Sequence, residues 1–406
     1  MKRSIAALAM TTSLVFATSA FAQTLDKVVK VGSLGDQSGL YADIGGPGST
    51  VAAQMAIEDS GLLAKGWKIE VIAADHQNKP DVGTNIGKQW IDVEKVDVFV
   101  DLASSGVGLA IANLAKEKNV VNLNSGSASS DLTGAQCSPN TIHWVYDTWM
   151  LANGTGKALV KSGGDSWFFL TADYAFGHAL ERDTSAVVTA NGGKVVGGVK
   201  HPLNTPDFSS FLLQAQSSKA KIIGLANAGG DTTNTIKQAA EFGIGKGGQK
   251  LAALLLFLTD VKAIGLETAQ GLNFTETFYW DMNDQTRAFS KRFGEKMKNG
   301  AMPTMVQAGV YAGVRHYLKT LDALGGNPHD GVKIVEKMKS MPTEDELFGK
   351  GEIQPNGRTI HNAYLFEVKK PSESKGPWDF YKLVGTVPGD QAFTPLSESK
   401  CPLLKK

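Results

Sequence analysis

The stretch from Val96 to Thr133 constrains the fold more than any other part of this sequence. It contains two short apolar runs with the character of strands, Val96–Asp101 and Val120–Asn124, and an amphipathic helical pattern, Leu109–Lys118, lies between them. A strand, a helix and a second strand in this order form a βαβ crossover, which joins strands of a parallel sheet. The sequence therefore predicts an α/β protein built on parallel sheets.

Both predicted strands end in short loops that are rich in serine. Ser104 and Ser105 follow the first strand, and Ser127, Ala128 and Ser129 follow the second. Ligands of open α/β sheets bind beyond the carboxyl ends of the strands, where hydroxyls and free backbone amides near a helix N-terminus suit a carboxylate. The same serines could serve only as caps of the following helices. Both interpretations stand at this point.

The first 22 residues have the pattern of an export signal. Lys2 and Arg3 precede a mostly apolar run, and Ala20–Ala22 matches the A-x-A cleavage pattern. The apolar run is too short to span a membrane. We therefore expect residues 1–22 to be a cleaved signal peptide and the mature protein to be soluble in the periplasm.

Charge and cysteine content narrow the possible partners. The chain has 41 basic and 40 acidic side chains, for a formal net charge of +1, which gives no support to binding of nucleic acid or of an anionic membrane. Its two cysteines, Cys137 and Cys401, predict a disulfide rather than a metal site in an exported protein. That bond would strap the tail, residues 389–406, to the first domain.

Two series of strands and helices follow one another, with a break near Asn140–Thr148. The first series begins with a strand at Val28–Leu34. Strands of the second series are expected at Trp167–Thr171, Lys194–Val199, Lys221–Ala226 and Leu251–Leu258. Amphipathic helices are then expected at Asn283–Lys298, Met305–Leu324 and Asp330–Met338. Two later strands would be joined by an exposed hairpin loop, Pro371–Trp378.

The motifs of common enzymes are missing from the sequence or stand in the wrong place. Gly243–Gly248 satisfies G-x-G-x-x-G, but it follows a helix and precedes a strand, the reverse of a dinucleotide site. The sequence has no G-x-S-x-G elbow and no H-E-x-x-H pair, and its seven histidines are scattered. We expect no cofactor, no metal and no enzymatic activity. A secreted hydrolase whose residues meet only in space is the rival interpretation.

Polar and aromatic residues of the second series supply candidates for a wall that faces the serine loops. The cluster Phe278–Asp281 lies near a crossing between the two series, where its rings could line a cleft or simply pack at a domain boundary. Other candidates come directly after predicted strands. The predicted set is Tyr174, Phe176, Asn227, Asp231, Tyr279 and Trp280.

Taken in order, these loops resemble those of the periplasmic substrate-binding proteins of branched-chain amino acid (Leu/Ile/Val-type) ABC transporters, over nearly the whole mature chain. The segments that carry the resemblance are Val31–Tyr41, Ala56–Gly61, Leu102–Gly106, Ser125–Thr133 and Ala172–Gly177. The resemblance implies the type I periplasmic binding protein fold, in which two doubly wound parallel-sheet domains, joined by a three-segment hinge, close like a clam-shell. The first lobe would comprise residues 27–147 and 280–355, and the second lobe residues 148–279 and 356–388.

The resemblance also implies roles for individual residues. Carried over by position, the loops of Ser104 and Ser105 and of Ser127, Ala128 and Ser129 would bind the α-carboxylate and ammonium of an amino acid. Ser129 stands where family members often have Thr, so the hydroxyl is kept. A further position departs from the family: Phe176 matches an aromatic residue of the second lobe but has no hydroxyl, which predicts an apolar contact.

The function implied is that of the solute-binding component of an ABC importer. It would capture a branched-chain or other amino acid, or another small carboxylate, and deliver it as a monomer to an inner-membrane permease. Asp231, Asp260 and Asp281 compete as partner of an ammonium group, so the amino-acid specificity stays open. A ligand such as an aromatic acid or amide, and a role as a ligand sensor, are the alternatives.

Overall fold

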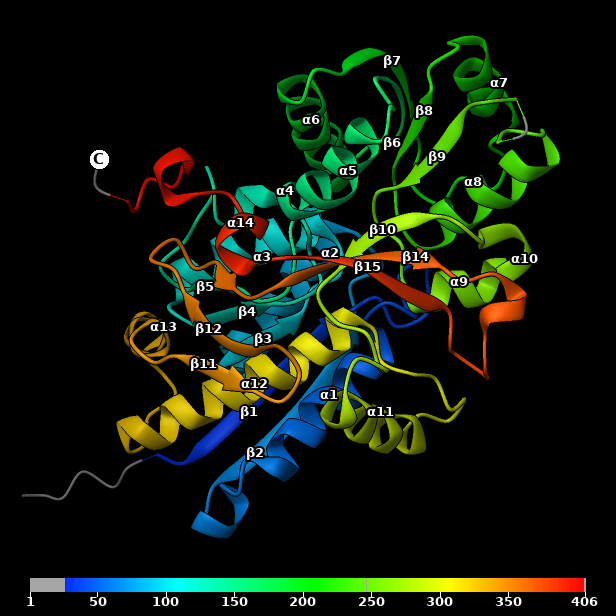
Figure 1. The fold of residues 1–406 in the computed structure, drawn as a ribbon. Coiled ribbons are helices and arrows are strands. Elements are labelled where there is room, and N and C mark those ends of the chain that lie inside the picture. The colour runs from blue at the N-terminus through cyan, green and yellow to red at the C-terminus, as the bar shows by residue number, and fades with distance from the viewer. Residues whose placement is uncertain (1–25, 246, 405–406) are drawn as a thin grey trace, which may run out of the picture.

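The computed structural model describes residues 26–245 and 247–404, so the expected signal peptide lies outside the described residues. Two parallel sheets form its centre, which confirms the α/β prediction (Figure 1). The five-stranded sheet has the order β2-β1-β3-β4-β5 and consists of β1 (Val28–Gly35), β2 (Lys68–Asp75), β3 (Val98–Asp101), β4 (Val121–Asn124) and β5 (Thr141–His143). The four-stranded sheet has the order β7-β6-β8-β9 and consists of β6 (Ser166–Ala172), β7 (Lys194–His201), β8 (Ile222–Ala226) and β9 (Lys250–Ala253).

We call the five-stranded sheet with its helices the first lobe and the four-stranded sheet with its helices the second lobe. Helices of the first lobe are α1 (Gly46–Asp59), α2 (Pro80–Gln89), α3 (Ser105–Lys118), α11 (Asp284–Lys296), α12 (Met305–Leu324) and α13 (Gly331–Lys339). Helices of the second lobe are α4 (Thr148–Leu151), α5 (Lys157–Lys161), α6 (Ala175–Ala190), α7 (Ser209–Ser217), α8 (Gly230–Glu241), α9 (Leu258–Ile264) and α10 (Leu266–Ala269). The exact lobe boundaries stay a prediction.

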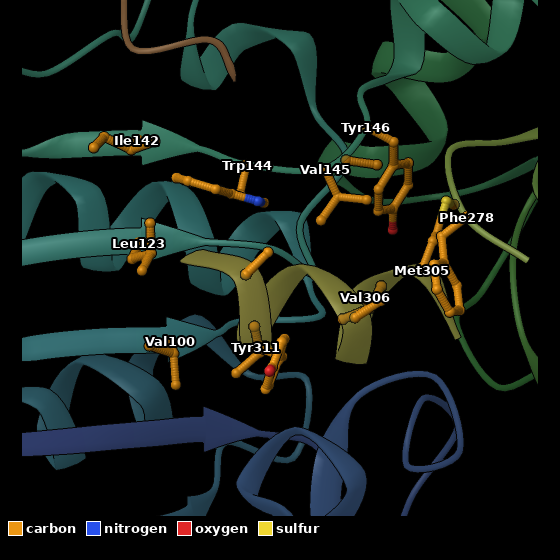
Figure 2. Close-up of a cluster of buried hydrophobic side chains, with 14 of the residues drawn as sticks. Val100, Leu123, Ile142, Trp144, Val145, Tyr146, Phe278, Met305, Val306 and Tyr311 are labelled. Atoms are coloured by element: carbon orange, nitrogen blue, oxygen red, sulfur yellow. The ribbon is translucent and has the colours of Figure 1, made fainter. Parts of the chain in front are cut away.

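Helix α12 packs on the first sheet although it follows the second lobe in the sequence. Figure 2 shows Tyr311 of this helix toward the strand residues Val100 and Leu123, and Val306 of the same helix toward Val145. Two glycines let the helix approach closely: a Cβ atom at Gly309 would lie 2.0 Å from Val145 Cγ2, and one at Gly313 would lie 3.0 Å from Leu123 Cδ2. The apolar stripe of α12 therefore completes the core of the first lobe.

Two small antiparallel sheets complete the fold. One has the order β10-β14-β15 and consists of β10 (Asn273–Glu276), β14 (Ala363–Val368) and β15 (Tyr381–Val387). The other consists of β11 (Thr343–Asp345), β12 (Gly349–Ile353) and β13 (Thr359–Ile360). Figure 1 shows the β10-β14-β15 sheet between the two parallel sheets. The chain crosses between the lobes after β5, after β10 and between β13 and β14, which is the three-segment hinge that was expected.

Some elements differ from the sequence-based expectation. Helix α3 begins at Ser105 rather than Leu109, because the small residues before Leu109 form its first turn. The predicted strand Leu251–Leu258 ends at Ala253, and Leu258 begins α9. An unbroken apolar run marks burial but not strand geometry, and here its second half is a buried loop. Trp378, placed in an exposed hairpin loop, is only 7% exposed.

The C-terminal tail returns to the first lobe. A disulfide joins Cys137 and Cys401, whose Cα atoms are 5.5 Å apart, as predicted. Helix α14 (Gly389–Ala392) precedes Cys401 in the tail. Asn153 of the second lobe donates a 2.7 Å hydrogen bond to the carbonyl of Gln391 in this helix. The tail therefore contacts both lobes before it is fixed covalently. Among the helices described, none is both long and apolar enough to cross a membrane.

Candidate functional site

The strained exit of strand β3 sets the position of the first serine loop. Asp101 and Leu102 have φ angles of 74° and 64°, values that cost a non-glycine residue free energy and that often occur at functional sites. The amide of Gly126 donates a 2.7 Å hydrogen bond to the carbonyl of Asp101. A Cβ atom at Gly126 would lie 2.6 Å from Ala103 Cα, so only glycine allows the two loops to meet this closely.

Three of the predicted serine hydroxyls form hydrogen bonds to the backbone, and two of these residues, Ser105 and Ser127, join the two loops. Ser105 Oγ accepts hydrogen bonds from the amides of Ala128, at 3.2 Å, and Ser129, at 3.1 Å. Ser127 Oγ donates to the carbonyl of Leu102. Ser129 Oγ accepts from the amide of Asp131 at 3.3 Å and so caps a short 3-10 turn. For Ser129 the capping interpretation therefore describes the structure.

Ser104 differs from these three residues. It is only 1% exposed and occupies the N-cap position of α3, yet its hydroxyl makes no capping bond and has no hydrogen-bond partner among the described residues. The backbone amides of the first turn of any helix have no intrahelical hydrogen-bond partner. They point out of the N-terminal end of the helix, where they attract anions. Ser104 Oγ and the first turn of α3 together form a set of donors suited to a carboxylate.

A cavity lies between the two lobes at the ends of their strands. The residues around it are mostly aromatic or aliphatic. Its walls are Tyr41, Ile44, Ala103, Gly126, Ala128 and Tyr146 on one side and Tyr174, Phe176, Ala228, Leu255 and Phe257 on the other. Its volume is about 10 Å³, close to the space for a single water molecule. A Cβ atom at Gly229 of the second lobe would lie 2.7 Å from the carbonyl of Leu40 of the first, so the lobes are closed on each other.

Tyrosine hydroxyls provide the polar atoms of this cavity. Tyr41 and Tyr174 belong to different lobes, and their hydroxyl oxygens are 2.7 Å apart. Two hydroxyls that share one hydrogen bond keep one hydrogen free for a ligand. Tyr146 donates its own hydrogen to the carbonyl of Gly126 at 2.8 Å. Burial raises the pKa of all three phenols well above the usual range, so they stay protonated.

The loop that carries Tyr41 is built around Asp36. Its carboxylate accepts hydrogen bonds from the amides of Gly39, at 2.6 Å, and Tyr41, at 2.9 Å. This compact turn follows β1 and projects the Tyr41 ring across the lobe interface. Tyr41 stands at the end of a segment that carried the family resemblance, so a signal for it was present in the sequence. Phe257 had no such signal, because it was hidden in the apolar run that was expected to be a strand.

The predicted site residues separate into three groups. Ala128, Tyr174 and Phe176 line the cavity. The four serines form the two loops beside it. The last group, Asn227, Asp231, Tyr279 and Trp280, lies outside the lining. Asn227 is buried directly after β8, where its side-chain amide bonds the hydroxyls of two threonines of α8. Tyr279 Oη and Trp280 Nε1 both donate to the carbonyl of Trp378, at 3.1 and 2.8 Å.

The three acidic candidates for an ammonium partner are engaged elsewhere. Asp231 accepts two backbone hydrogen bonds, from Asn204 and Thr205, and burial raises its pKa to about 6. Asp260 accepts from the amide of Phe257 at the start of α9, and burial raises its pKa to about 7. Asp281 pairs with an arginine on the surface. Within the lining of the cavity, tyrosine is the one ionisable residue type.

Comparison with known proteins identifies the family. A model of the family described as "Periplasmic binding protein" matches residues 28–376. A periplasmic binding protein from Burkholderia mallei of known structure is 52% identical, with a TM-score of 0.89 over 93% of this chain and 100% of that one. A branched-chain amino acid ABC transporter periplasmic ligand-binding protein from Burkholderia xenovorans is 39% identical, with a TM-score of 0.81 over 92% of this chain and 99% of that one.

A solved structure of lower sequence identity has the same fold and contains an aromatic acid. The solute-binding protein of an ABC transporter from R. palustris, solved in complex with 4-hydroxybenzoate, is 23% identical. Its TM-score is 0.82 over 91% of this chain and 100% of that one. The match to the family model, the two-lobed fold and the cavity between the lobes all point to the same family. The chain belongs to the periplasmic binding protein family, whose members bind small solutes for ABC transporters.

Proposed function

We propose that this protein captures a small carboxylate with an apolar body and no ammonium group, and delivers it to the inner-membrane permease of an ABC importer. The observation that carries the proposal is the cleft cavity. Its lining is aromatic and aliphatic and includes Ala103, which directly precedes Ser104, the residue with a free hydroxyl at the start of α3. We expect the ligand to leave the protein chemically unchanged.

The donors around the cavity suit one carboxylate. The first amides of α3, Ser104 Oγ and the spare hydroxyl hydrogen of the Tyr41–Tyr174 pair are all donors, and bonds to a carboxylate are strengthened by its charge. Ala103 and Ala128 line the cavity next to these donors. The apolar body of the ligand would then pack against Phe176 and Phe257.

An ammonium group finds no partner in this arrangement. Asp231 and Asp260 serve neighbouring backbone amides, and Asp281 pairs with Arg287. Burial of a cation without a counter-charge costs several kcal/mol. A solute-binding protein from R. palustris with the same fold was solved in complex with 4-hydroxybenzoate, which supports an aromatic acid as a candidate ligand. An aliphatic or aromatic monocarboxylate therefore fits better than an amino acid.

Binding would require the lobes to open and close. A cavity of about 10 Å³ has no room for a carboxylic acid of this class, so the ligand enters an open form. It then contacts both lobes in a closed form with a wider cleft than this one. Because the ligand interacts with both lobes only when they are closed, it shifts the population toward closure.

Calorimetry with matched ligands tests the proposal. Leucine and 4-methylpentanoate differ only in the ammonium group, and benzoate adds an aromatic acid. We expect 4-methylpentanoate or benzoate to bind at least tenfold more tightly than leucine, a difference of about 1.4 kcal/mol or more. Tighter binding of leucine would overturn the exclusion of an ammonium group. No binding by any of the three acids would overturn the proposed function.

A further inference from the structure

A second and much larger cavity lies between the lobes beside the cleft. Its volume is about 660 Å³, within the range of small-molecule sites. The first lobe contributes the loop after β1, the start of α1 and the end of α11. The second lobe contributes α9 and the hairpin loop. The wall residues that carry its chemistry are Gln37, Val51, Thr259, Lys262, Lys298 and Trp378.

This cavity is distinct from the cleft. Tyr41 and Ile44 line the cleft, whereas Ala42 and Asp43, between them in the sequence, line the second cavity. On the other lobe, Phe257 lines the cleft and Thr259 the second cavity. A single turn on each side therefore separates the two spaces. A molecule in one of them would not occupy the other.

The walls combine an apolar surface with unpaired positive charge. Lys262 Nζ lies 3.8 Å from the centroid of the Trp378 ring, in a cation–π contact. Lys296 forms an ion pair with Glu58 at 2.9 Å, but Lys262 and Lys298 have no such partner within the described part of the chain. Asp43 supplies the one negative charge of the lining. The balance of charge favours an anion.

Two polar atoms in the walls are also without partners. Gln37 Nε2 and Thr259 Oγ1 are buried, and neither forms a hydrogen bond to any described residue. They belong to different lobes and both line the cavity. Buried polar atoms normally have hydrogen-bond partners. Because both residues line the cavity, rotation of either side chain would bring its polar group to a bound molecule.

We propose that this cavity is a second ligand site, which takes an amphipathic organic anion and is spatially distinct from the site proposed in the cleft. The apolar part of the anion would pack between Val51 and Trp378. Its charged group would lie near Lys262 and Lys298. Because such a molecule contacts both lobes, its binding favours the closed form and is coupled reciprocally to binding in the cleft.

Fluorescence titration with 8-anilinonaphthalene-1-sulfonate, an aromatic anion, tests the site. Lys262→Gln combined with Lys298→Gln should weaken binding of this probe at least tenfold. Lys88→Gln combined with Lys116→Gln makes the same charge change at exposed positions on α2 and α3, and should leave the probe affinity unchanged. Equal weakening in the two double variants, or no binding by the wild type, would overturn the proposal.

Competition separates this site from the cleft. Saturating 4-methylpentanoate should leave the probe bound and tighten its binding, because both molecules favour closed lobes. Displacement of the probe would place it in the cleft and overturn the second site. If no acid binds in the cleft but the probe still depends on Lys262 and Lys298, the second site stands and the proposed function falls. Trp378→Phe should also reduce energy transfer from the protein to the probe.

Discussion

Ser104 and Ser129 are similar in sequence context but have different roles in the structure. Ser104→Ala should remove a charge-assisted hydrogen bond and weaken binding of the cleft ligand by about 1.5–3 kcal/mol, with the free energy of unfolding nearly unchanged. Ser129→Ala should lower the free energy of unfolding by about 0.5–2 kcal/mol, since it loses a cap, and keep the affinity. Calorimetry and urea denaturation measure the two quantities. The same profile in both variants would contradict the assignment.

Asp101 makes stability depend on pH. Burial, helped by the nearby Asp36 carboxylate, raises the pKa of Asp101 to about 8, whereas an unfolded aspartate has a pKa of about 3.9. Between these values the folded state holds a proton that the unfolded state has lost. The free energy of unfolding therefore falls as pH rises from about 4 to about 8, by up to about 1.4 kcal/mol per pH unit from this group.

The matched variant isolates this effect from the other buried carboxyls. Asp101→Asn removes the titrating group and keeps an acceptor for the amide of Gly46, which lies 2.9 Å from Asp101 Oδ2. Urea denaturation at pH 5 and pH 8 should show a smaller loss of stability in the variant than in the wild type. Equal losses would mean that Asp101 is ionised at both pH values in the folded protein.

At this scale the sequence predicted where the serine loops lie but not which hydroxyls are free. The position of a loop after a strand follows from local pattern. The engagement of Ser105 depends on the amides of Ala128 and Ser129, more than 20 residues away. Contacts of that kind arise only when the two loops meet in space. Tyr41 could have been assigned from its place after the first strand, whereas Phe257 could not.

At the scale of elements, length and capping decided what could be predicted. Helix α12 was predicted with its observed bounds, because a long apolar stripe begins at the capping residue Thr304 and ends before Gly325. Strands β10 to β13 were missed. They have two to five residues each, which is too short for a periodic pattern. Their pairing depends on neighbouring strands rather than on their own sequence.

The packing of α12 gives a prediction for this element. Gly309→Ala should lower the free energy of unfolding by about 1–3 kcal/mol, because the new methyl group meets Val145 in a full core. This loss should exceed the gain in helix propensity of about 1 kcal/mol. Gly294→Ala in α11 is the control, since its Cβ would lie 3.3 Å from the flexible end of Met302. The control should be neutral or stabilising in thermal and urea denaturation.

For the whole molecule, contacts between the lobes outside the lining of the cavity contribute to the closed arrangement. Arg182 of α6 donates to Asp131 at 3.1 Å and to Ser130 at 2.8 Å, both on the first lobe. Arg182→Gln should weaken binding of the cleft ligand by about two- to fivefold, the size expected for an exposed ion pair, because open lobes become more populated. Small-angle scattering of the ligand-free protein should show a larger radius of gyration.

The control for this variant removes an arginine whose ion pair lies within a single lobe. Arg292 of α11 pairs with Asp59 of α1 at 2.9 Å, and both helices belong to the first lobe. Arg292→Gln should leave both the affinity and the radius of gyration unchanged. If the two variants behave alike, the contact of Arg182 does not contribute to closure.

The disulfide of the tail can form only late in export. Cys137 and Cys401 are separated by 264 residues in the sequence. A periplasmic protein that crosses the inner membrane with its N-terminus first exposes Cys137 while the whole second lobe is still on the other side. Its partner, Cys401, arrives only after the chain between the two cysteines, which includes the second lobe, has crossed. Cys137 should therefore react with a thiol-alkylating reagent in chains arrested during export and be protected in chains that have been released.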